Sequence, residues 1–271
     1  MGEQPNKILF LIGGNAGAGK DSFADYLRGI TTLWDGTYST AYAYGIKKIL
    51  HETYGTPWEI LNGDKDVKES NFVYMGKTQT KITIRRALQK VGQFHRETVG
   101  PTCWAAATLT RCKQSQKRIC IVTDARHPAE EIHWIGEQAS SVGFLVVPVR
   151  IRRASVPVNP DHPSESLIVA EPDGSFSFLI DNEGSLADLK RAAEQVACAA
   201  VLLQKSGSKK LSKKKDLAWV VRAENGYLPY EPMLSAEDAD LLCEQLIDSE
   251  GFPHSAEVVM FDSLKGAACG N

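Results

Sequence analysis

Residues 13–22, GGNAGAGKDS, decide the fold. The short apolar run KILFLI, residues 7–12, precedes them and is typical of a strand buried on both faces. After them, apolar residues recur on one helical face from Phe23 to Ile30. A glycine-rich turn between a buried strand and an amphipathic helix is the context of a phosphate-binding loop. The sequence therefore predicts such a loop, against the alternative of a glycine-rich turn without a ligand.

The chemistry of this loop is that of its backbone. Glycines let successive N–H groups turn toward one anion, and the following helix adds its positive end. Lys20 supplies a mobile cation for the β- and γ-phosphates of ATP. The predicted phosphate-binding residues are Gly14, Asn15, Ala16, Gly17, Ala18, Gly19, Lys20, Asp21 and Ser22.

Asp21 departs from the usual G-x-x-x-x-G-K-[ST] pattern, in which a hydroxyl at this position binds Mg²⁺. The carboxylate could hold the ion through water, or it could face away at the start of the helix and interact with the dipole. Ser22 could instead offer a hydroxyl one position later. These alternatives stay open, and Asp21 and Ser22 are both candidate metal residues.

Strand and helix patterns alternate along the first 204 residues. Strands are expected at 41–44, 119–123, 143–151 and 176–180, and helices at 46–54, 82–97, 104–112, 129–139 and 186–203. This order predicts an α/β fold with a parallel sheet covered on both faces. Ligands of such sheets bind at the carboxyl ends of the strands, so Gly14, Asp124 and Arg152 should lie near one edge.

Asp124 follows the buried run in RICIVTDAR. An acid at this place could orient Mg²⁺ or its waters, and Asp124 is therefore a candidate catalytic and metal residue. The alternative is a polar residue that caps the turn after the strand.

Two arginine sets indicate a second anionic ligand. Arg85 and Arg96 are eleven residues apart, close to three helical turns, with Gly92 on the same face. Arg152 and Arg153 follow a strand and precede ASVPVNPDHPSES, whose prolines are expected to exclude helix and central strand. An arginine-bearing loop here is typical of a lid that closes over a phosphoryl group. Solvated surface arginines and an irregular surface loop are the alternatives.

Two phosphate sites suffice for a nucleoside monophosphate kinase. The acceptor phosphate has a second pKa of about 6, so it is largely dianionic near neutral pH and needs no general base. Holding two anions in line requires Mg²⁺, lysine and several arginines. A kinase for another small metabolite and an ATP-binding regulatory or nucleic-acid-associated protein are the competing interpretations.

The sequence resembles the phage-type deoxynucleoside monophosphate kinases over residues 7–203. The similar segments, in the order of that family, are GGNAGAGKDS, AYAYGIKKIL, IRRALQKVGQFHRETVGPTCW, VTDARHPAEEI, DHPSES and LIDNEGSLADL. In that family Gly-Lys-Asp followed by Thr or Ser is common, which accounts for Asp21. The segment QFHRE and His127 depart from the family's pattern and leave the base preference open.

The resemblance implies a three-layer P-loop kinase fold with a mobile lid. It also implies transfer of a phosphoryl group from ATP, with Mg²⁺, to a deoxynucleoside 5′-monophosphate. By position, Arg85 and Arg96 would hold the acceptor phosphate, while Arg126 and Arg152 or Arg153 would face the transferring group. The other substrate residues implied are Lys47, Gln89, Trp104 and Glu165. Together with Lys20 and Asp124, the three arginines 126, 152 and 153 form the predicted catalytic set.

The last quarter of the chain, residues 205–271, has a charge asymmetry. Residues 205–215 carry six lysines and no acid, whereas residues 216–271 carry eleven acids against two bases. We expect a kinase domain at 1–204, a linker at 205–215 and a small acidic α+β module at 216–271. Within the module we expect a hairpin turning at Asn225-Gly226, a helix at 235–248 and a strand at 256–261. The module could mediate homo-oligomerisation or partner binding, and the alternative is a stabilising appendage without a ligand of its own. Nucleic-acid binding is not expected, because the linker has no aromatic residue and precedes an acidic module.

The composition points to an ordinary cytoplasmic protein, in the host cytoplasm if a phage encodes it. Of the residues 43% are hydrophobic and 24% charged, and no apolar run approaches the ~20 residues that span a bilayer. The six cysteines have no metal-site spacing and are expected to be reduced thiols. No membrane partner is expected.

Overall fold

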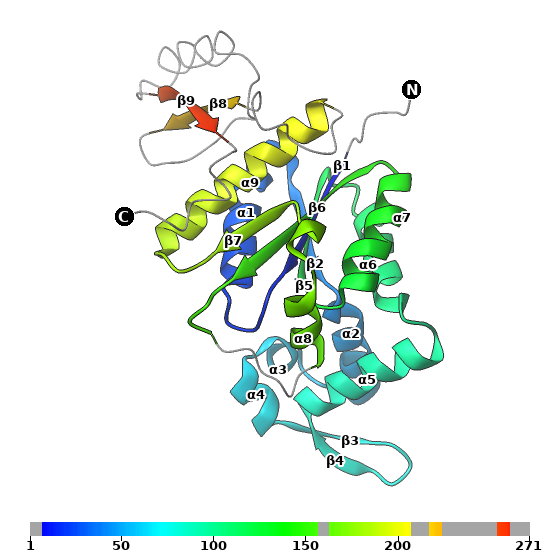
Figure 1. Ribbon diagram of the computed structural model, residues 1–271. Coiled ribbons are helices and arrows are strands. Elements are labelled where there is room, and N and C mark those ends of the chain that lie inside the picture. Colours follow the sequence, from blue (N-terminus) through cyan, green and yellow to red (C-terminus); the bar gives the residue numbers. More distant parts are fainter. Residues whose placement is uncertain (1–6, 157–162, 207–216, 224–253, 261–271) are drawn as a thin grey trace. The chain divides into compact units, whose positions relative to one another are not determined.

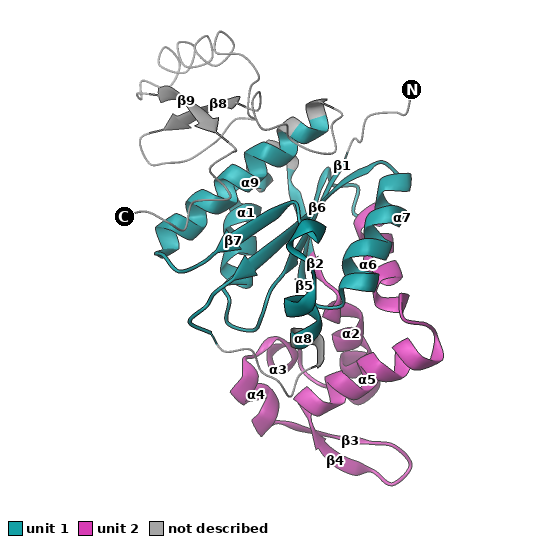
Figure 2. Ribbon diagram, viewed as in Figure 1, with its two compact units in different colours: residues 1–39, 115–271 teal, residues 40–114 magenta. Residues whose placement is uncertain are grey.

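The computed structural model describes residues 7–156, 163–206, 217–223 and 254–260 (Figure 1). The chain divides into two compact units, which Figure 2 colours separately. Unit 1 comprises residues 1–39 and 115–271, and unit 2 comprises residues 40–114. The glycine-rich loop belongs to unit 1, and the Arg85–Arg96 pair belongs to unit 2.

Unit 1 is built on a five-stranded sheet with the order β2-β5-β1-β6-β7. The strands are β1 (Lys7–Gly13), β2 (Thr37–Ala41), β5 (Ile119–Ala125), β6 (Phe144–Arg152) and β7 (Phe178–Asp181). The central strand β1 pairs in parallel with β5 and β6, and β6 pairs in parallel with β7. The α/β fold with a parallel sheet, predicted from the alternating patterns, is confirmed.

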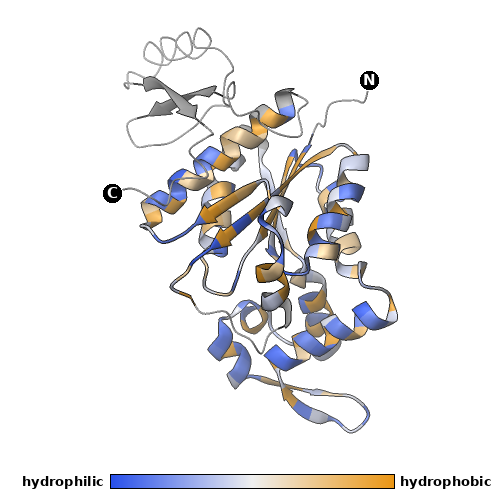
Figure 3. Cartoon of the chain, in the orientation of Figure 1, coloured by the Kyte–Doolittle hydropathy of each residue, from blue (hydrophilic) through white to orange (hydrophobic). Residues whose placement is uncertain are grey.

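The strand β1 is buried on both faces, as its continuous apolar run predicts. Ile8, Phe10 and Ile12 belong to a core shared with α1 (Lys20–Asp35) and α9 (Leu186–Ser206). Leu9 and Leu11 alternate with them and are also fully buried. Figure 3 shows the corresponding concentration of hydrophobic colour on the central strands. The loop that follows β1 therefore starts from a rigid point in the middle of the sheet.

The remaining elements of unit 1 follow β5 and β6. The segment after β5 forms a π-helix, Ala129–Trp134, continued by α7 (Ile135–Ser141), which contacts β6. After β6 come α8 (Pro163–Ala170) and a short 3₁₀-helix, Asp173–Ser175. The expectation that the prolines exclude helix from this segment is wrong at its end, because α8 begins at Pro163. Proline is tolerated in the first turn of a helix, where its missing N–H has no partner to lose.

Unit 2 is a helical unit with one β-hairpin. Its elements are α2 (Ala43–Tyr54), α3 (Trp58–Asn62), α4 (Lys65–Ser70), β3 (Phe72–Met75), β4 (Thr80–Thr83), α5 (Ile84–Thr98) and α6 (Cys103–Gln114). Leu50, Leu61, Ile84 and Trp104 share one core cluster. Thr83 caps α5 by accepting a hydrogen bond from the N–H of Arg86 at 3.2 Å.

The strand expected at 41–44 is wrong. The strand β2 ends at Ala41, and α2 begins at Ala43. Ile46 and Leu50 lie four residues apart and both face the core of unit 2. The helix that they anchor begins at Ala43, within the alternating stretch AYAY at 41–44 that favoured a strand. The hairpin β3–β4 and the short helices α3, α4 and α8 were not predicted.

The C-terminal segment contains two described strands. The strand β8 (Leu217–Ala223) pairs antiparallel with β9 (His254–Met260), which confirms a strand near the predicted 256–261. The expected turn at Asn225-Gly226 and the expected helix at 235–248 lie outside the described residues, as do positions 207–215 of the linker. The first two positions of that linker, 205 and 206, are the end of α9.

Candidate functional site

The glycine-rich loop connects the end of β1 with the start of α1. Gly14, Gly17 and Gly19 have φ values of 150°, 80° and 95°, in the region that residues with a Cβ rarely adopt. A Cβ on Gly14 would lie 2.4 Å from the carbonyl oxygen of Ile151, and a Cβ on Gly19 would lie 2.3 Å from the amide nitrogen of Asn182. The three glycines are therefore required by the shape of the loop itself. Such a loop at a helix start can direct several N–H groups toward one anion.

The side chains at the start of α1 differ in exposure. Lys20 is buried, with 6% of its surface exposed, and its Nζ lies 4.0 Å from the Oδ2 atom of Asp21. The Asp21 side chain is 81% exposed, and Ser22 is half-buried. This exposure leaves both the water-mediated role and the dipole role considered for Asp21 open.

The strand ends bring the predicted unit 1 residues to one edge. Gly13 is in register with Ala125 of β5 and with Arg150 of β6, so the ends of the three strands are neighbours. Asp124 and Arg152 lie at these ends. The expectation that Gly14, Asp124 and Arg152 share an edge of the sheet is confirmed.

Asp124 has an unusual backbone. Its φ of 64° is in the left-handed region, which costs most non-glycine residues about 1 kcal/mol or more. Two and three residues after it, the N–H groups of Arg126 and His127 both donate to Oε2 of Glu131, at 2.8 and 3.0 Å. Glu131 is 2% exposed and lies in the π-helix. The buried carboxylate thus fixes the turn that carries Asp124 and Arg126.

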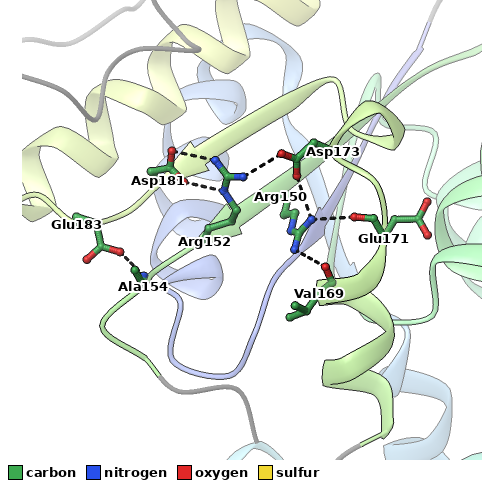
Figure 4. A network of polar contacts seen from close by, with 8 residues as sticks. All are labelled: Arg150, Arg152, Ala154, Val169, Glu171, Asp173, Asp181 and Glu183. Atoms are coloured by element: carbon green, nitrogen blue, oxygen red, sulfur yellow. Dashed lines mark hydrogen bonds and ion pairs between the residues drawn. The ribbon is translucent and has the colours of Figure 1, made fainter. Parts of the chain in front are cut away.

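Arg152 and Arg150 enter a polar network at the ends of β6 and β7 (Figure 4). Arg152 makes two hydrogen bonds to the carboxylate of Asp181, at 2.7 and 3.0 Å, and a third to Asp173 at 3.1 Å. Arg150 donates to the carbonyl oxygens of Val169 and Glu171, both at 3.0 Å, and to Asp173 at 3.2 Å. In this structure two arginines therefore face two aspartates.

The network shifts the pKa values of its arginines in opposite directions. Burial lowers the pKa of Arg150, although Asp173 partly offsets this. The hydrogen bond to Asp181 is the main cause that raises the pKa of Arg152. Arg153 is exposed, and its Nε donates to Ser155 at 3.2 Å. Of the two predicted lid arginines, Arg152 is thus bound by carboxylates, whereas Arg153 donates to a neutral hydroxyl.

The predicted acceptor residues of unit 2 lie on α2, α5 and α6. On α5, Arg85 is half-buried with its Nε 3.7 Å from Glu69, Gln89 is exposed and Arg96 is half-buried. On α2, Lys47 donates to the side chain of Asn62 at 3.0 Å. All four belong to one compact unit, which carries none of the loop residues.

Trp104 and Gly92 have a packing role. The indole N–H of Trp104 donates to the carbonyl oxygen of Gly92 at 3.1 Å, and Trp104 is 6% exposed. A Cβ on Gly92 would lie 3.0 Å from the side chain of Ile46. Close helix packing therefore accounts for the glycine on the arginine face. The substrate role of Trp104 stays a prediction, as does that of Glu165, which lies in α8.

Sequence reasoning missed the residues that support the site. Glu131, Asn182, Asp173 and Asp181 were not singled out. Asp181 is the last residue of β7, and Asn182 directly follows it. This position at a strand end is the only local signal that the two residues carry. Their partners are 29 to 164 positions away in the sequence, at Arg152 and Ala18.

The described residues also bear on membrane and metal binding. No helix in this part of the chain is both long and apolar enough to cross a membrane. Nor do three or more His, Cys, Asp or Glu side chains gather there in a group that could hold a metal ion. Mg²⁺ in phosphoryl-transfer sites is held largely by phosphates and water with one or two carboxylates, so its binding does not require such a group.

No family model and no curated protein matches the chain. Among solved structures, one similar chain is an unliganded sugar kinase from a Janibacter species. It is 9% identical, with a TM-score of 0.33, and the alignment covers 74% of this chain and 98% of that one.

Proposed function

We propose that the protein transfers a phosphoryl group from ATP to a deoxynucleoside 5′-monophosphate. The observation that carries the proposal is the loop between β1 and α1. Three glycines with positive φ precede a buried Lys20 at the start of a sixteen-residue helix. A cradle that a Cβ would fill, with a cation beside it, fits the phosphates of a nucleotide.

The chain's own residues have distinct roles in this proposal. The loop N–H groups hold the ATP phosphates, and Lys20 neutralises charge on the β- and γ-oxygens. Mg²⁺, when bound, would screen the repulsion between the phosphates, with Asp124 as the acid placed at the neighbouring strand end. Arg126 and Arg153 would face the transferring group, because Arg152 is already engaged by two aspartates.

The acceptor class rests on the arginines of unit 2 and on the resemblance. Arg85 and Arg96 lie on one helix, at a spacing close to three turns, and both are half-buried. Each guanidinium could donate to a phosphate oxygen of the substrate, and a phosphate acceptor needs no general base. A hydroxyl acceptor would require a base, and none was recognised in the sequence.

The test is an ADP-release assay with ATP, Mg²⁺ and each of dTMP, dGMP, dCMP, dAMP and 5-hydroxymethyl-dCMP. We expect turnover with at least one of them, and its loss in Lys20→Ala. Lys48→Ala is the matched control, because Lys48 is an exposed lysine paired with Glu52 on α2. ATP binding is measured separately by calorimetry. Tight ATP binding without turnover on any monophosphate would reject the acceptor class, and absence of ATP binding would reject the whole proposal.

A further inference from the structure

Asn182 lies against the back of the glycine-rich loop. It directly follows β7, and its side chain donates from Nδ2 to the carbonyl oxygen of Ala18 at 2.9 Å. Its own N–H donates to the carbonyl oxygen of Arg152 at 2.7 Å. Asn182 is 9% exposed, and its hydrogen bond to Ala18 is buried. One residue thus connects the loop after β1 with the end of β6.

The bond to Ala18 determines which way the next peptide group faces. In a trans peptide the C=O and the N–H point in opposite directions, and the described residues contain no cis peptide bond. Holding the Ala18 oxygen on the Asn182 side therefore directs the N–H of Gly19 to the opposite side. If this peptide turned over, a carbonyl oxygen would replace an N–H there, and it would repel an anion.

Gly19 is matched to the same side chain. A Cβ on Gly19 would lie 2.3 Å from Nδ2 of Asn182, and the φ of Gly19 is 95°. The second glycine of the motif is therefore required by the approach of Asn182 as well as by its backbone conformation. The short Asn side chain and the missing Cβ together allow the amide to reach the Ala18 oxygen.

We propose that Asn182 is a positioning residue, which keeps the Ala18–Gly19 peptide oriented for phosphate binding without touching the phosphate. The inference rests on the proposed function of the loop as the ATP phosphate site. It adds a residue 163 positions from Gly19 to the set that determines ATP affinity. Asn182 belongs to LIDNEGSLADL, a segment with no binding role of its own in the function proposed above.

The experiment measures binding of ATP and of inorganic triphosphate by calorimetry, in the full chain and without an acceptor. Asn182→Ala removes the donor, and we expect affinity for both ligands to fall about tenfold, the effect of losing one buried hydrogen bond. Asn182→Asp is nearly isosteric, but its carboxylate acts only as an acceptor when ionised. At neutral pH this variant should therefore bind ATP and triphosphate more weakly than Asn182→Ala does. In the separate ADP-release assay, which includes the acceptor, KM for ATP should rise by the same factor as the loss of affinity, while KM for the acceptor stays unchanged.

The pH dependence separates positioning from general stability. A protonated carboxyl can donate to Ala18, so the affinity of Asn182→Asp should rise relative to that of Asn182→Ala as the pH falls. Asn71→Asp is the matched control, because Asn71 donates in the same way to the carbonyl oxygen of Val67 at 2.8 Å, in unit 2. It should leave ATP affinity unchanged. Thermal unfolding verifies that each variant folds, and Asn182→Ala alone suffices if the aspartate variant does not fold.

The outcomes distinguish the two proposals. Wild-type affinity for triphosphate in folded Asn182→Ala would overturn the positioning role and leave the kinase proposal intact. Binding of ATP without turnover, weakened in both Asn182 variants, would support the positioning role while rejecting the acceptor class. Failure of the wild-type chain to bind ATP or triphosphate would reject both.

Discussion

A Cβ atom on Gly14 would lie 2.4 Å from the carbonyl oxygen of Ile151, the penultimate residue of β6. The loop after one strand is thus packed against the backbone of its neighbour. Because the contact is to backbone, no side chain can move aside. This contact ties the shape of the loop to the sheet before any ligand binds.

Gly14→Ala should therefore destabilise the protein. Overpacking and a φ of 150° together should lower the free energy of unfolding by about 2 kcal/mol or more. Gly29→Ala is the control, since Gly29 is exposed in α1 and a Cβ added there would meet no atom within 4 Å. Alanine at this position should stabilise the helix by up to ~1 kcal/mol. Urea denaturation measures both variants, and equal stability of the two would contradict the packing argument.

Arg150 and Arg153 should differ in what they contribute. Arg150→Ala removes the donor to the carbonyl oxygens of Val169 and Glu171. It also removes one of the two arginines that bind Asp173, which keeps its bond to Arg152. The free energy of unfolding should therefore fall by about 2–4 kcal/mol. Arg153→Ala removes an exposed side chain and should change stability by less than ~0.5 kcal/mol. It should nevertheless lower kcat in the ADP-release assay. Denaturation and kinetics on the same two preparations give the comparison, and unchanged kcat in Arg153→Ala would remove this residue from the catalytic set.

The acid dependence of stability should include a contribution from the start of α9. Hydrogen bonds from the side chain and the N–H of Ser185 lower the pKa of Asp188. A carboxyl with a lowered pKa stabilises the folded state above its unfolded pKa of about 4, and the effect is lost as the pH falls through the folded value. Unfolding free energies of the wild type and Asp188→Asn should therefore differ by a nearly constant amount from pH 7 down to about pH 4, and converge as the pH falls further, through the lowered folded pKa. A difference that persists unchanged at pH values well below about 4 would show that ionisation of Asp188 is not its cause.

Glu131→Gln should loosen the turn that carries Asp124 and Arg126. One buried carboxylate oxygen accepts two N–H groups, and a neutral amide accepts them more weakly while adding an NH₂ group that needs its own partner. We expect a loss of about 1–3 kcal/mol in unfolding free energy together with a lower kcat. Glu130→Gln, at the more exposed neighbouring position, is the control. Wild-type kcat in a measurably destabilised Glu131→Gln would show that the turn supports the fold alone.

The sequence was sufficient to predict the central strand of the sheet and the glycine-rich loop after it, for physical reasons. The continuous apolar run of β1 and the glycines after it are local signals, and the left-handed backbone of Gly17 and Gly19 needs residues without a Cβ. The supporting contacts could not be predicted in this way. Asn182 and Ala18 are joined by one hydrogen bond across 164 positions, and the Arg152–Asp181 pair depends on the register of β6 with β7.

The strand expected at 41–44 illustrates the same limit. Alternating small and aromatic residues favour a strand locally, whereas the core of unit 2 selects a helix through Ile46 and Leu50. The choice between a strand period and a helical period over so few residues is decided by packing partners far along the chain. Gly92 gives a second example. From the sequence alone, a glycine between Arg85 and Arg96 could leave room for a phosphate. In the structure Gly92 instead packs against Ile46 and accepts a hydrogen bond from Trp104.

Asp124 offers a test of whether strain is retained for activity. Its φ of 64° is unfavourable for a residue with a Cβ, so Asp124→Gly should relieve about 1 kcal/mol of backbone strain, which partly offsets the removal of the side chain and its interactions. Asp124→Asn keeps the shape and tolerates the same backbone but removes the charge. If the carboxylate orients Mg²⁺, both variants should lose about a hundredfold or more in kcat, and the asparagine variant should remain close to the wild type in unfolding free energy. A Mg²⁺ titration of the residual activity should then show weaker half-saturation in both variants. Wild-type kcat in folded Asp124→Asn would assign the residue to the turn and leave the metal site to other groups.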